Sequence, residues 1–236
     1  MSNKLIVSAA HYAPEFLDAA GTTKKVVDAI GLAKKQNSKL IAFPESFLPG
    51  FPIWNAIGKP INNHDFFARF VENSIRIDGP EIKAISDTAK KNSIIVSVGF
   101  SERVSQSVGC LFNSNVIINE SGEIINHHRK IVPTFFEKLT WSNGDSHGLK
   151  VVDTKIGKIG ALICGENTNP LARYSMIADG EQIHVSSYPP IWPTHSPNAN
   201  DRYDLASAIR IRAGAHSFEG KVFNIVASSI IDEKTK

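Results

Sequence analysis

Cys164 is the residue of this sequence with the clearest chemical potential, because it lies where an apolar segment ends. Residues 158–163 have the length and composition of a buried strand, and Cys164-Gly165 follows directly. Asn169 and Pro170 have the residue types of a helix N-cap and a first helical position. A nearby helix N-terminus favours the thiolate form of a cysteine. The pattern predicts a thiol nucleophile at a strand-to-helix turn; the alternative is a buried structural thiol.

A thiol nucleophile needs a base for its proton and a group that stabilises the charge developing on the substrate. Glu45 follows Pro44 and the apolar strand predicted at residues 39–43. A carboxylate desolvated there holds a proton more readily and can act as a general base. Lys130 ends another predicted strand and could stabilise an anionic intermediate together with the Gly165 N–H. The simpler alternatives are a solvated glutamate and a surface lysine in the basic run HHRK.

Histidine is the commonest base partner of a nucleophilic cysteine, but its spacing gives no such signal in this sequence. His127 and His128 are adjacent, so on a strand they point to opposite faces. Three other histidines stay open as partners of Cys164, with no spacing that favours them: His184, His195 and His147. No pair of residues has convincing metal-ligand spacing, and two cysteines make a structural zinc site improbable.

Length and composition describe a globular protein. The 236 residues are 42% hydrophobic and 21% charged, and the formal net charge is only +3. Basic residues are scattered among acidic ones, so we expect no nucleic-acid or membrane surface. Two cysteines fit a reducing compartment better than a disulfide framework. The sequence shows neither the apolar region of a signal peptide nor a stretch of membrane-spanning length, so we expect a cytoplasmic protein.

The hydrophobic pattern predicts a mixed order of strands and helices. The strands are expected at residues 4–10, 39–43, 94–100, 110–118, 123–128, 149–154, 158–163, 181–186 and 221–231. The helices are expected at about residues 22–36, 64–75, 80–92, 171–178 and 201–218. Several strand pairs read as hairpins, and no linker interrupts the chain. We therefore predict one α+β domain over residues 1–236, with helices outside sheets.

Three long stretches carry a family resemblance. FPESFLPGFP (43–52), HRKIVPTFFEKLTWSNGD (128–145) and CGENTNPLARYSMIADGEQIHVSSYPP (164–190) resemble the signature regions of the nitrilase family within the carbon–nitrogen hydrolases. The resemblance implies a four-layer αββα sandwich. It places a Glu–Lys–Cys triad on Glu45, Lys130 and Cys164, and an additional glutamate on Glu137. It also implies a homo-oligomer that requires neither a cofactor nor a metal.

The resemblance further implies a reaction and a substrate pocket. The expected activity is hydrolysis of a small nitrile by water to the carboxylic acid and ammonia, through a thioimidate and a thioester on Cys164. Cyanide hydration and amide hydrolysis are the neighbouring activities. We expect Gly165 to contribute its N–H to substrate binding. Residues in the flanking loops are expected to line the pocket, with loop packing as their alternative role: Trp141, Tyr188, Pro190, Trp192 and His195.

The last predicted strand raises a further expectation. FNIVASSII is followed only by DEKTK, whereas members of the resembled family continue with further strands. The resemblance therefore predicts a nitrilase-type sandwich that lacks its C-terminal strands, and an apolar strand without a partner would leave a sheet edge uncovered. Two function classes follow. One is a working nitrile hydrolase; the other is an inactive homologue, or a structural subunit that assembles with a complete homologue.

Overall fold

A computed structural model describes residues 4–193, 203–233 and 235, and contains two β-sheets. The first sheet consists of β1 (Val7–Ala9), β2 (Leu40–Ala42), β3 (Ile95–Val104), β4 (Ser107–Ile118) and β5 (Ile124–Arg129), in that order. The second consists of β6 (Val152–Thr154), β7 (Gly157–Ile163), β8 (Ile183–Tyr188) and β9 (Phe223–Ser228). In the first sheet β1, β2 and β3 run parallel, and β4 pairs antiparallel with both β3 and β5. In the second sheet β7, β8 and β9 run parallel, and β6 pairs antiparallel with β7.

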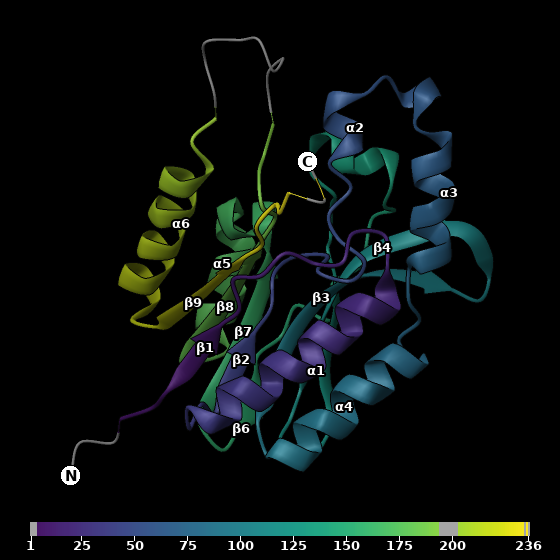
Figure 1. Ribbon diagram of the computed structural model, residues 1–236. Coiled ribbons are helices and arrows are strands. Elements are labelled where there is room, and N and C mark those ends of the chain that lie inside the picture. Colours follow the sequence, from purple (N-terminus) through teal and green to yellow (C-terminus); the bar gives the residue numbers. More distant parts are fainter. Residues whose placement is uncertain (1–3, 194–202, 234, 236) are drawn as a thin grey trace.

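The helices lie outside these sheets. They are α1 (Ala19–Lys35), α2 (Trp54–Ile57), α3 (His64–Asn73), α4 (Pro80–Asn92), α5 (Pro170–Ala178) and α6 (Leu205–Gly220). Three short 3-10 helices, η1 (Pro60–Asn62), η2 (Phe135–Leu139) and η3 (Cys164–Thr168), lie in the connections. Figure 1 shows α1 and α4 side by side on one side of the molecule and α6 on the other.

The two sheets bury an apolar layer between them. On β2, Leu40 and Ala42 point toward the second sheet, where Ile159 and Val185 belong to the same buried cluster. Ile41 points the other way and packs with residues of α1 and α4. This alternation follows from the two-residue period of a strand, and it requires an apolar residue at every position of a doubly covered strand.

The outer faces of both sheets are covered by amphipathic helices. Val26 and Ile30 of α1 and Ile85 of α4 are fully buried against the first sheet. Ala172 and Met176 of α5 pack on Leu162 of the second sheet. The layer order is therefore helices, sheet, sheet, helices, which confirms the predicted α+β sandwich.

Helix α1 begins at Ala19, before the expected start near Thr22 and Thr23. Asp18 is its N-cap, and the Asp18 side chain accepts a hydrogen bond from the N–H of Gly21. Both threonines are buried inside the helix. The helix therefore starts earlier than expected because the Asp18 carboxylate caps its first turn. At the other end of the chain, α6 is capped by Asp204 and extends to Gly220.

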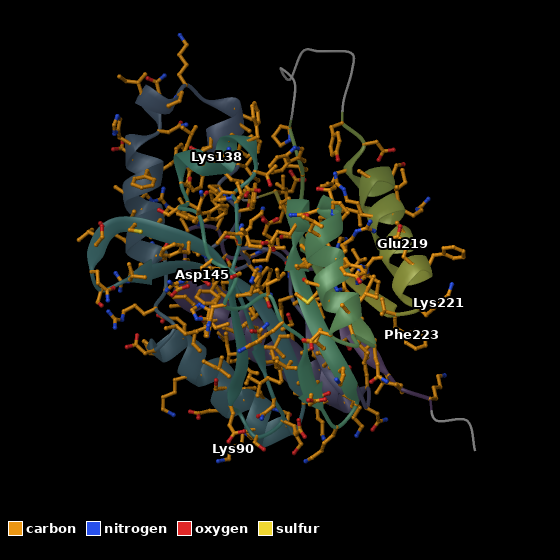
Figure 2. All side chains as sticks on the ribbon, turned by 180° about the vertical axis from the view of Figure 1, so that it is seen from behind. Lys90, Lys138, Asp145, Glu219, Lys221 and Phe223 are labelled. Carbon is orange, nitrogen blue, oxygen red and sulfur yellow. The ribbon has the colours of Figure 1, made fainter. Side chains whose placement is uncertain are left out.

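Charged side chains are distributed over the outer surface. Lys90, Lys138 and Lys221 lie in separate regions of the molecule (Figure 2), as the scattered basic residues of the sequence suggest. Within the part of the chain that the structure describes, no helix combines the length and hydropathy needed to cross a bilayer.

Candidate active site

The turn after β7 carries Cys164 as the first residue of η3. Asn169 caps α5 by accepting hydrogen bonds from two N–H groups of its first turn, and Pro170 is the first helical residue. The predicted strand-to-helix turn is therefore present, with one 3-10 turn between the thiol and α5. Cys164 is buried and has a φ of +45°, which is uncommon for a residue with a side chain. Such strained backbone is found preferentially at functional sites.

Lys130 lies between two glutamates in the interior. Its Nζ donates to Glu45 Oε1 at 2.8 Å and to Glu137 Oε1 and Oε2 at 2.9 and 2.7 Å. None of the three residues is more than 1% exposed. One ammonium therefore serves two carboxylates, and the cluster carries a net negative charge when both carboxylates are ionised.

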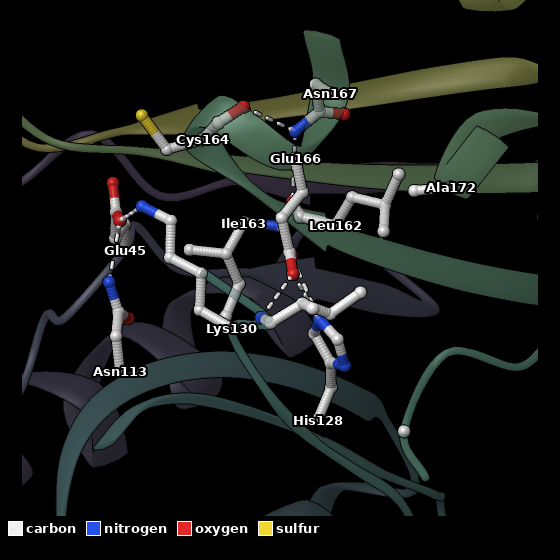
Figure 3. Close-up of polar contacts among 12 residues, drawn as sticks. Glu45, Asn113, His128, Lys130, Leu162, Ile163, Cys164, Glu166, Asn167 and Ala172 are labelled. Atoms are coloured by element: carbon white, nitrogen blue, oxygen red, sulfur yellow. Dashed lines mark hydrogen bonds and ion pairs between the residues drawn. The ribbon is translucent and has the colours of Figure 1, made fainter. Parts of the chain in front are cut away.

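Glu45 has one occupied and one free carboxylate oxygen. Oε1 accepts from Lys130 and also from Asn113 Nδ2 at 2.7 Å. Oε2 is buried and has no hydrogen-bond partner among the described residues. One side-chain oxygen of Glu45, one of Glu137 and Cys164 Sγ lie within 4.8 Å of one another. Figure 3 shows the Cys164 sulfur on the same side as the Glu45 carboxylate and the Lys130 ammonium. This arrangement lets Glu45 exchange a proton with the thiol.

The position of Glu45 depends on a glycine in the neighbouring strand. A Cβ on Gly99 of β3 would lie 2.5 Å from the Pro44 carbonyl oxygen and 2.8 Å from the Ser46 nitrogen, so only glycine lets this turn lie against β3. The Glu45 N–H donates to the Tyr188 carbonyl oxygen at 3.4 Å. Glu45 is thereby held between the first sheet and β8 of the second.

Lys130 and Glu137 are fixed by their own backbone contacts. The Lys130 N–H donates to the Asn113 carbonyl oxygen at 2.7 Å, and the Gly144 N–H donates to the Lys130 carbonyl oxygen at 2.9 Å. Glu137 belongs to η2, where the Thr134 N–H donates to its Oε2 at 2.9 Å in a capping box. The Glu137 carboxylate is therefore oriented by its own turn before it meets the lysine.

Burial and mutual charge set the protonation of these groups. Burial alone lowers the pKa of Lys130, but the carboxylates of Glu137 and Glu45 outweigh it and leave that pKa raised. Burial raises the pKa of Glu137 to about 7; Lys130 opposes this rise and Glu45 adds to it. Burial and the charge of Glu45 raise the pKa of the Cys164 thiol, and Lys130 offsets this only in part.

The sequence suggests a thiolate stabilised by the helix N-terminus, whereas burial and the charge of Glu45 raise the pKa of the Cys164 thiol well above its ordinary value. A thiol with such a pKa holds its proton at neutral pH. A nucleophile of this kind needs a base in contact with it, which increases the importance of the free oxygen of Glu45.

Two of the predicted substrate-binding residues lie at the thiol. Tyr188 is fully buried and packs in one cluster with Ile163 and Cys164. Gly165 faces Thr134, because a Cβ at this position would lie 2.6 Å from Thr134 Oγ1. A side chain there would push η2 and η3 apart.

The two predicted tryptophans belong to an aromatic cluster. Trp141 is buried beside Phe51, and its Nε1 donates to Ser101 Oγ at 3.0 Å, so the structure places it in loop packing. Trp192 is partly exposed and stacks on Phe136, with 4.6 Å between ring centroids. Because Phe136 directly precedes Glu137, Trp192 packs against the segment that carries the additional glutamate.

Pro190 and His195 differ from these residues in position. Pro190 lines a cavity of about 640 Å³ between α6 and β9. Cys164, Glu45 and Lys130 are not among the described residues that line this cavity. His195 lies outside the described residues.

The alternative pairing of Cys164 with a histidine receives no support from the described residues. His184 is buried with Nδ1 2.6 Å from Glu181 Oε1 and Nε2 2.9 Å from Asn167 Oδ1, so both ring nitrogens are engaged elsewhere. His147 is exposed. Glu45 and Glu137 are instead the side chains that cluster with the Cys164 thiol, with their ligand atoms within 4.8 Å of one another.

Three further polar residues contribute to this site without having been predicted. Asn113 donates to Glu45, and Glu166 and Asn167 hold the turn around Cys164. Their signal is weak: Asn113 is one of several polar residues of β4, and Glu166 and Asn167 lie in the turn that follows Cys164. Nothing in the sequence shows which face of β4 Asn113 occupies, or that the two residues after Gly165 point inward.

Sequence comparison relates the chain to known proteins. Residues 6–232 match the carbon–nitrogen hydrolase family. A nitrilase of Penicillium rubens is 33% identical over 99% of this chain and 71% of its own length. An arylacetonitrilase of Macrophomina phaseolina is 40% identical over 82% of this chain and 57% of its own length. Two further curated relatives are also matched over only part of their own lengths, 53% and 72%.

Solved structures show the same fold at low sequence identity. A carbon–nitrogen hydrolase of Helicobacter pylori G27 has a TM-score of 0.73 at 19% identity, over 97% of this chain and 74% of that one. An amidase of Nesterenkonia sp. AN1 has a TM-score of 0.72 at 17% identity, over 94% of this chain and 77% of that one. Taken with the family match and the curated relatives, the chain belongs to the nitrilase family of the carbon–nitrogen hydrolases, which act on carbon–nitrogen bonds.

Proposed function

We propose that this protein hydrolyses a nitrile to its carboxylic acid and ammonia, with Cys164 as nucleophile and Glu45 as base. The observation that carries the proposal is the buried, unpartnered Oε2 of Glu45 in the same cluster as a protonated thiol. Since Oε1 is occupied by Lys130 and Asn113, Oε2 is the oxygen left to receive the proton. Relatives named nitrilase and arylacetonitrilase support a nitrile as the substrate.

The first half of the reaction forms a carbon–sulfur bond. Glu45 takes the thiol proton as sulfur attacks the nitrile carbon, and the same proton passes to the nitrile nitrogen. The product is a neutral thioimidate on Cys164. The proton moves within the cluster throughout, so the buried site never acquires an additional uncompensated charge.

The second half consumes two water molecules. Glu45 activates the first water, which adds to the thioimidate carbon, and Lys130 with the Gly165 N–H stabilises the tetrahedral intermediate. Glu137, whose pKa is raised to about 7, can deliver a proton at neutral pH and assists the departure of nitrogen as ammonia. The resulting thioester is hydrolysed by the second water, which releases the acid and restores the thiol.

The group that leaves the tetrahedral intermediate determines whether the acid or the amide is formed. If sulfur leaves before nitrogen does, the product is the amide and the site acts as a hydratase. If an amide enters, attack by Cys164 leads to the same thioester, so amide hydrolysis uses the same groups. An inactive chain would form none of these products.

A product assay separates these cases. The protein is incubated with small aliphatic, aromatic and arylacetic nitriles and their amides, and ammonia, acid and amide are quantified. We expect ammonia from at least one nitrile, none from Cys164→Ala, and wild-type rates from Cys110→Ala, the matched control at the other, partly exposed cysteine. Turnover retained by Cys164→Ala would sink the assignment of the nucleophile. A wild type that releases neither ammonia nor amide would favour the inactive alternative.

A further inference from the structure

Glu166 joins the backbone segments that carry the two central side chains of the site. Its Oε1 accepts a hydrogen bond from the N–H of Ile131 at 2.8 Å, and its Oε2 accepts one from the N–H of Ile163 at 2.9 Å. Ile131 directly follows Lys130, and Ile163 directly precedes Cys164. Figure 3 shows the Glu166 side chain beside Ile163, with its carboxylate directed down toward His128.

These two segments belong to different sheets. Lys130 follows β5 of the first sheet and Cys164 follows β7 of the second, and β5 and β7 share no ladder of hydrogen bonds. Apolar packing between sheets has no directional preference, so it does not by itself fix how far one strand end lies from the other. The Glu166 carboxylate supplies a directional contact to each end.

A third donor anchors the carboxylate. His128 Nε2 lies 3.0 Å from Oε1 and 2.9 Å from Oε2. Burial raises the pKa of Glu166, but the His128 hydrogen bond and the N–H groups of Ile131 and Ile163 outweigh it and leave the pKa lowered. An ionised carboxylate accepts from all three donors, whereas a glutamine would turn an NH₂ group toward one of them.

The other side of the turn is held independently. Asn167 Nδ2 donates to the carbonyl oxygens of Leu162 and Cys164, both at 3.2 Å. Its Oδ1 accepts from Ser186 Oγ at 2.9 Å. Asn167 therefore ties the thiol segment to its own sheet, and Glu166 is the residue that ties it to the lysine segment of the other sheet.

We infer that Glu166 is a positioning residue that sets the separation between the Lys130 ammonium and the Cys164 thiol. It does not touch substrate, and it acts through the backbone of both segments. The consequence for turnover rests on the proposed function, but the consequence for the reactivity of the thiol does not. Removing one of its two backbone contacts lets Lys130 and Cys164 move apart, which weakens the stabilisation of negative charge on sulfur.

Alkylation of Cys164 by iodoacetamide tests this separation. Rates are followed by intact mass from pH 6 to pH 10 in a Cys110→Ser background, with wild type, Glu166→Gln and Glu166→Asp compared. The charged groups that act on the thiol are Glu45, Lys130, Glu137 and Arg212. In Glu166→Gln we expect alkylation at pH 8 to be about 10-fold slower and the pH profile to move to higher pH, because Lys130 lies further from sulfur. Glu166→Asp keeps the charge but is shorter, so we expect a smaller shift in the same direction.

Glu102→Gln is the matched control. Glu102 is also a buried carboxylate that accepts from three side chains, Ser114, His127 and Arg129, but it contacts neither backbone segment. We expect its alkylation profile to match that of wild type. Where a nitrile is turned over, Glu166→Gln should lower kcat about 10- to 100-fold and leave KM within about threefold.

A folded Glu166→Gln variant whose alkylation profile lies within twofold of wild type at every pH would overturn the inference. If Glu166→Gln shows no cooperative thermal unfolding, Glu166→Asp decides in its place, and a wild-type profile there overturns the inference equally. If wild type hydrolyses no nitrile, the proposed function fails, while the alkylation profiles still test the role of Glu166.

Discussion

The hairpin of β4 and β5 carries a cluster of charged side chains on each of its two faces, and adjacent residues contribute to the two clusters. Lys130 points to one side, where it donates to Glu45 and Glu137. Arg129 points to the other, where Nε donates to Glu102 Oε2 at 2.9 Å. Because successive side chains of a strand alternate between faces, one short sequence supplies a cation to each cluster.

The other strand of this hairpin, β4, also directs adjacent donor side chains to opposite faces. Asn113 of β4 donates to Glu45, and the next residue, Ser114, donates to Glu102 Oε2 at 2.7 Å. Ser114 and Arg129 face each other in the ladder of β4 and β5. The hairpin thus presents the same pair of donor types, one polar and one cationic, to each of its faces.

The clusters differ in how many donors each carboxylate receives. Glu102 alone receives Arg129, His127 and Ser114; burial raises its pKa, but these donors outweigh it and lower the pKa to about 2. Glu137 shares its cation with Glu45, and burial raises its pKa to about 7. A carboxylate with a surplus of donors keeps one charge state and holds the fold, whereas one that shares a cation can exchange a proton near neutral pH.

The largest expected effect comes from removing the shared cation. Lys130→Met keeps the length of the side chain but leaves two buried carboxylates without their ammonium. We expect a loss of about 3–5 kcal/mol in the free energy of unfolding, because a partner of a buried ion pair is left unpaired. We also expect ammonia release to fall at least about 100-fold. Urea denaturation and the ammonia assay measure the two effects.

Lys138→Met is the control for this variant. Lys138 lies on η2 near Glu137 in sequence but is exposed to solvent (Figure 2), so we expect a stability change within about 0.5 kcal/mol and unchanged activity. A stable, active Lys130→Met protein would mean that the two carboxylates do not need the lysine, and the contrast between the clusters would fail.

The pH dependence of stability should have opposite signs for the two clusters. The folded pKa of Glu137 is raised from 4.5 to about 7, so its contribution to stability is present below pH 4.5 and is lost as pH rises to about 7. The folded pKa of Glu102 is lowered from 4.5 to about 2, so its contribution is present above pH 4.5 and is lost as pH falls toward 2. Urea denaturation of wild type, Glu137→Gln and Glu102→Gln from pH 3 to pH 8 measures both.

The test compares the free energy of unfolding of each variant with that of wild type at every pH. The stability advantage of wild type over Glu102→Gln should grow between pH 3 and pH 5 and then stay level. Relative to Glu137→Gln, wild type should lose stability between pH 5 and pH 7. If both differences change in the same pH range and direction, the two carboxylates have similar environments and the comparison is refuted.

The positions of the central site residues could be predicted because each follows a strand. Glu45 and Cys164 follow apolar segments that are visible in the sequence, and Lys130 follows the strand predicted at residues 123–128. Glu137 could not be found this way. It lies on a 3-10 turn inside a loop without hydrophobic periodicity, so only the resemblance to a family pointed to it.

The environment of the thiol could not be predicted from its neighbours in sequence. The residues after Cys164 suggest a helix end that favours a thiolate, yet burial and Glu45 decide its protonation, and Glu45 comes from the other sheet. The same holds for Asn113 and Glu166. Asn113 meets Glu45 only when β4 and the end of β2 are placed in one sheet, and Glu166 meets Ile131 only when the two sheets are placed together.

A smaller effect should distinguish the two donors of β4. Asn113→Ala leaves Glu45 with one donor fewer and should cost about 1–3 kcal/mol of stability and about a 10-fold loss of kcat, because the base is less well fixed. Ser114→Ala should cost about 1 kcal/mol, because Glu102 retains Arg129 and His127, and should leave kcat within twofold. Steady-state kinetics and urea denaturation compare them. Equal losses of kcat in both variants would show that the two faces of the hairpin are not independent.

The smallest expected effect belongs to His127, the most replaceable donor of Glu102. Its Nε2 lies 2.8 Å from Glu102 Oε2, but its side chain is 26% exposed, and Glu102 keeps Arg129 and Ser114. We expect His127→Gln to lower the free energy of unfolding by at most about 1 kcal/mol and to leave ammonia release unchanged. Thermal unfolding and the same assay measure this. A loss of several kcal/mol would show that Glu102 has no surplus of donors. Lost activity without lost stability would mean that the cluster around Glu102 positions Lys130 through β5.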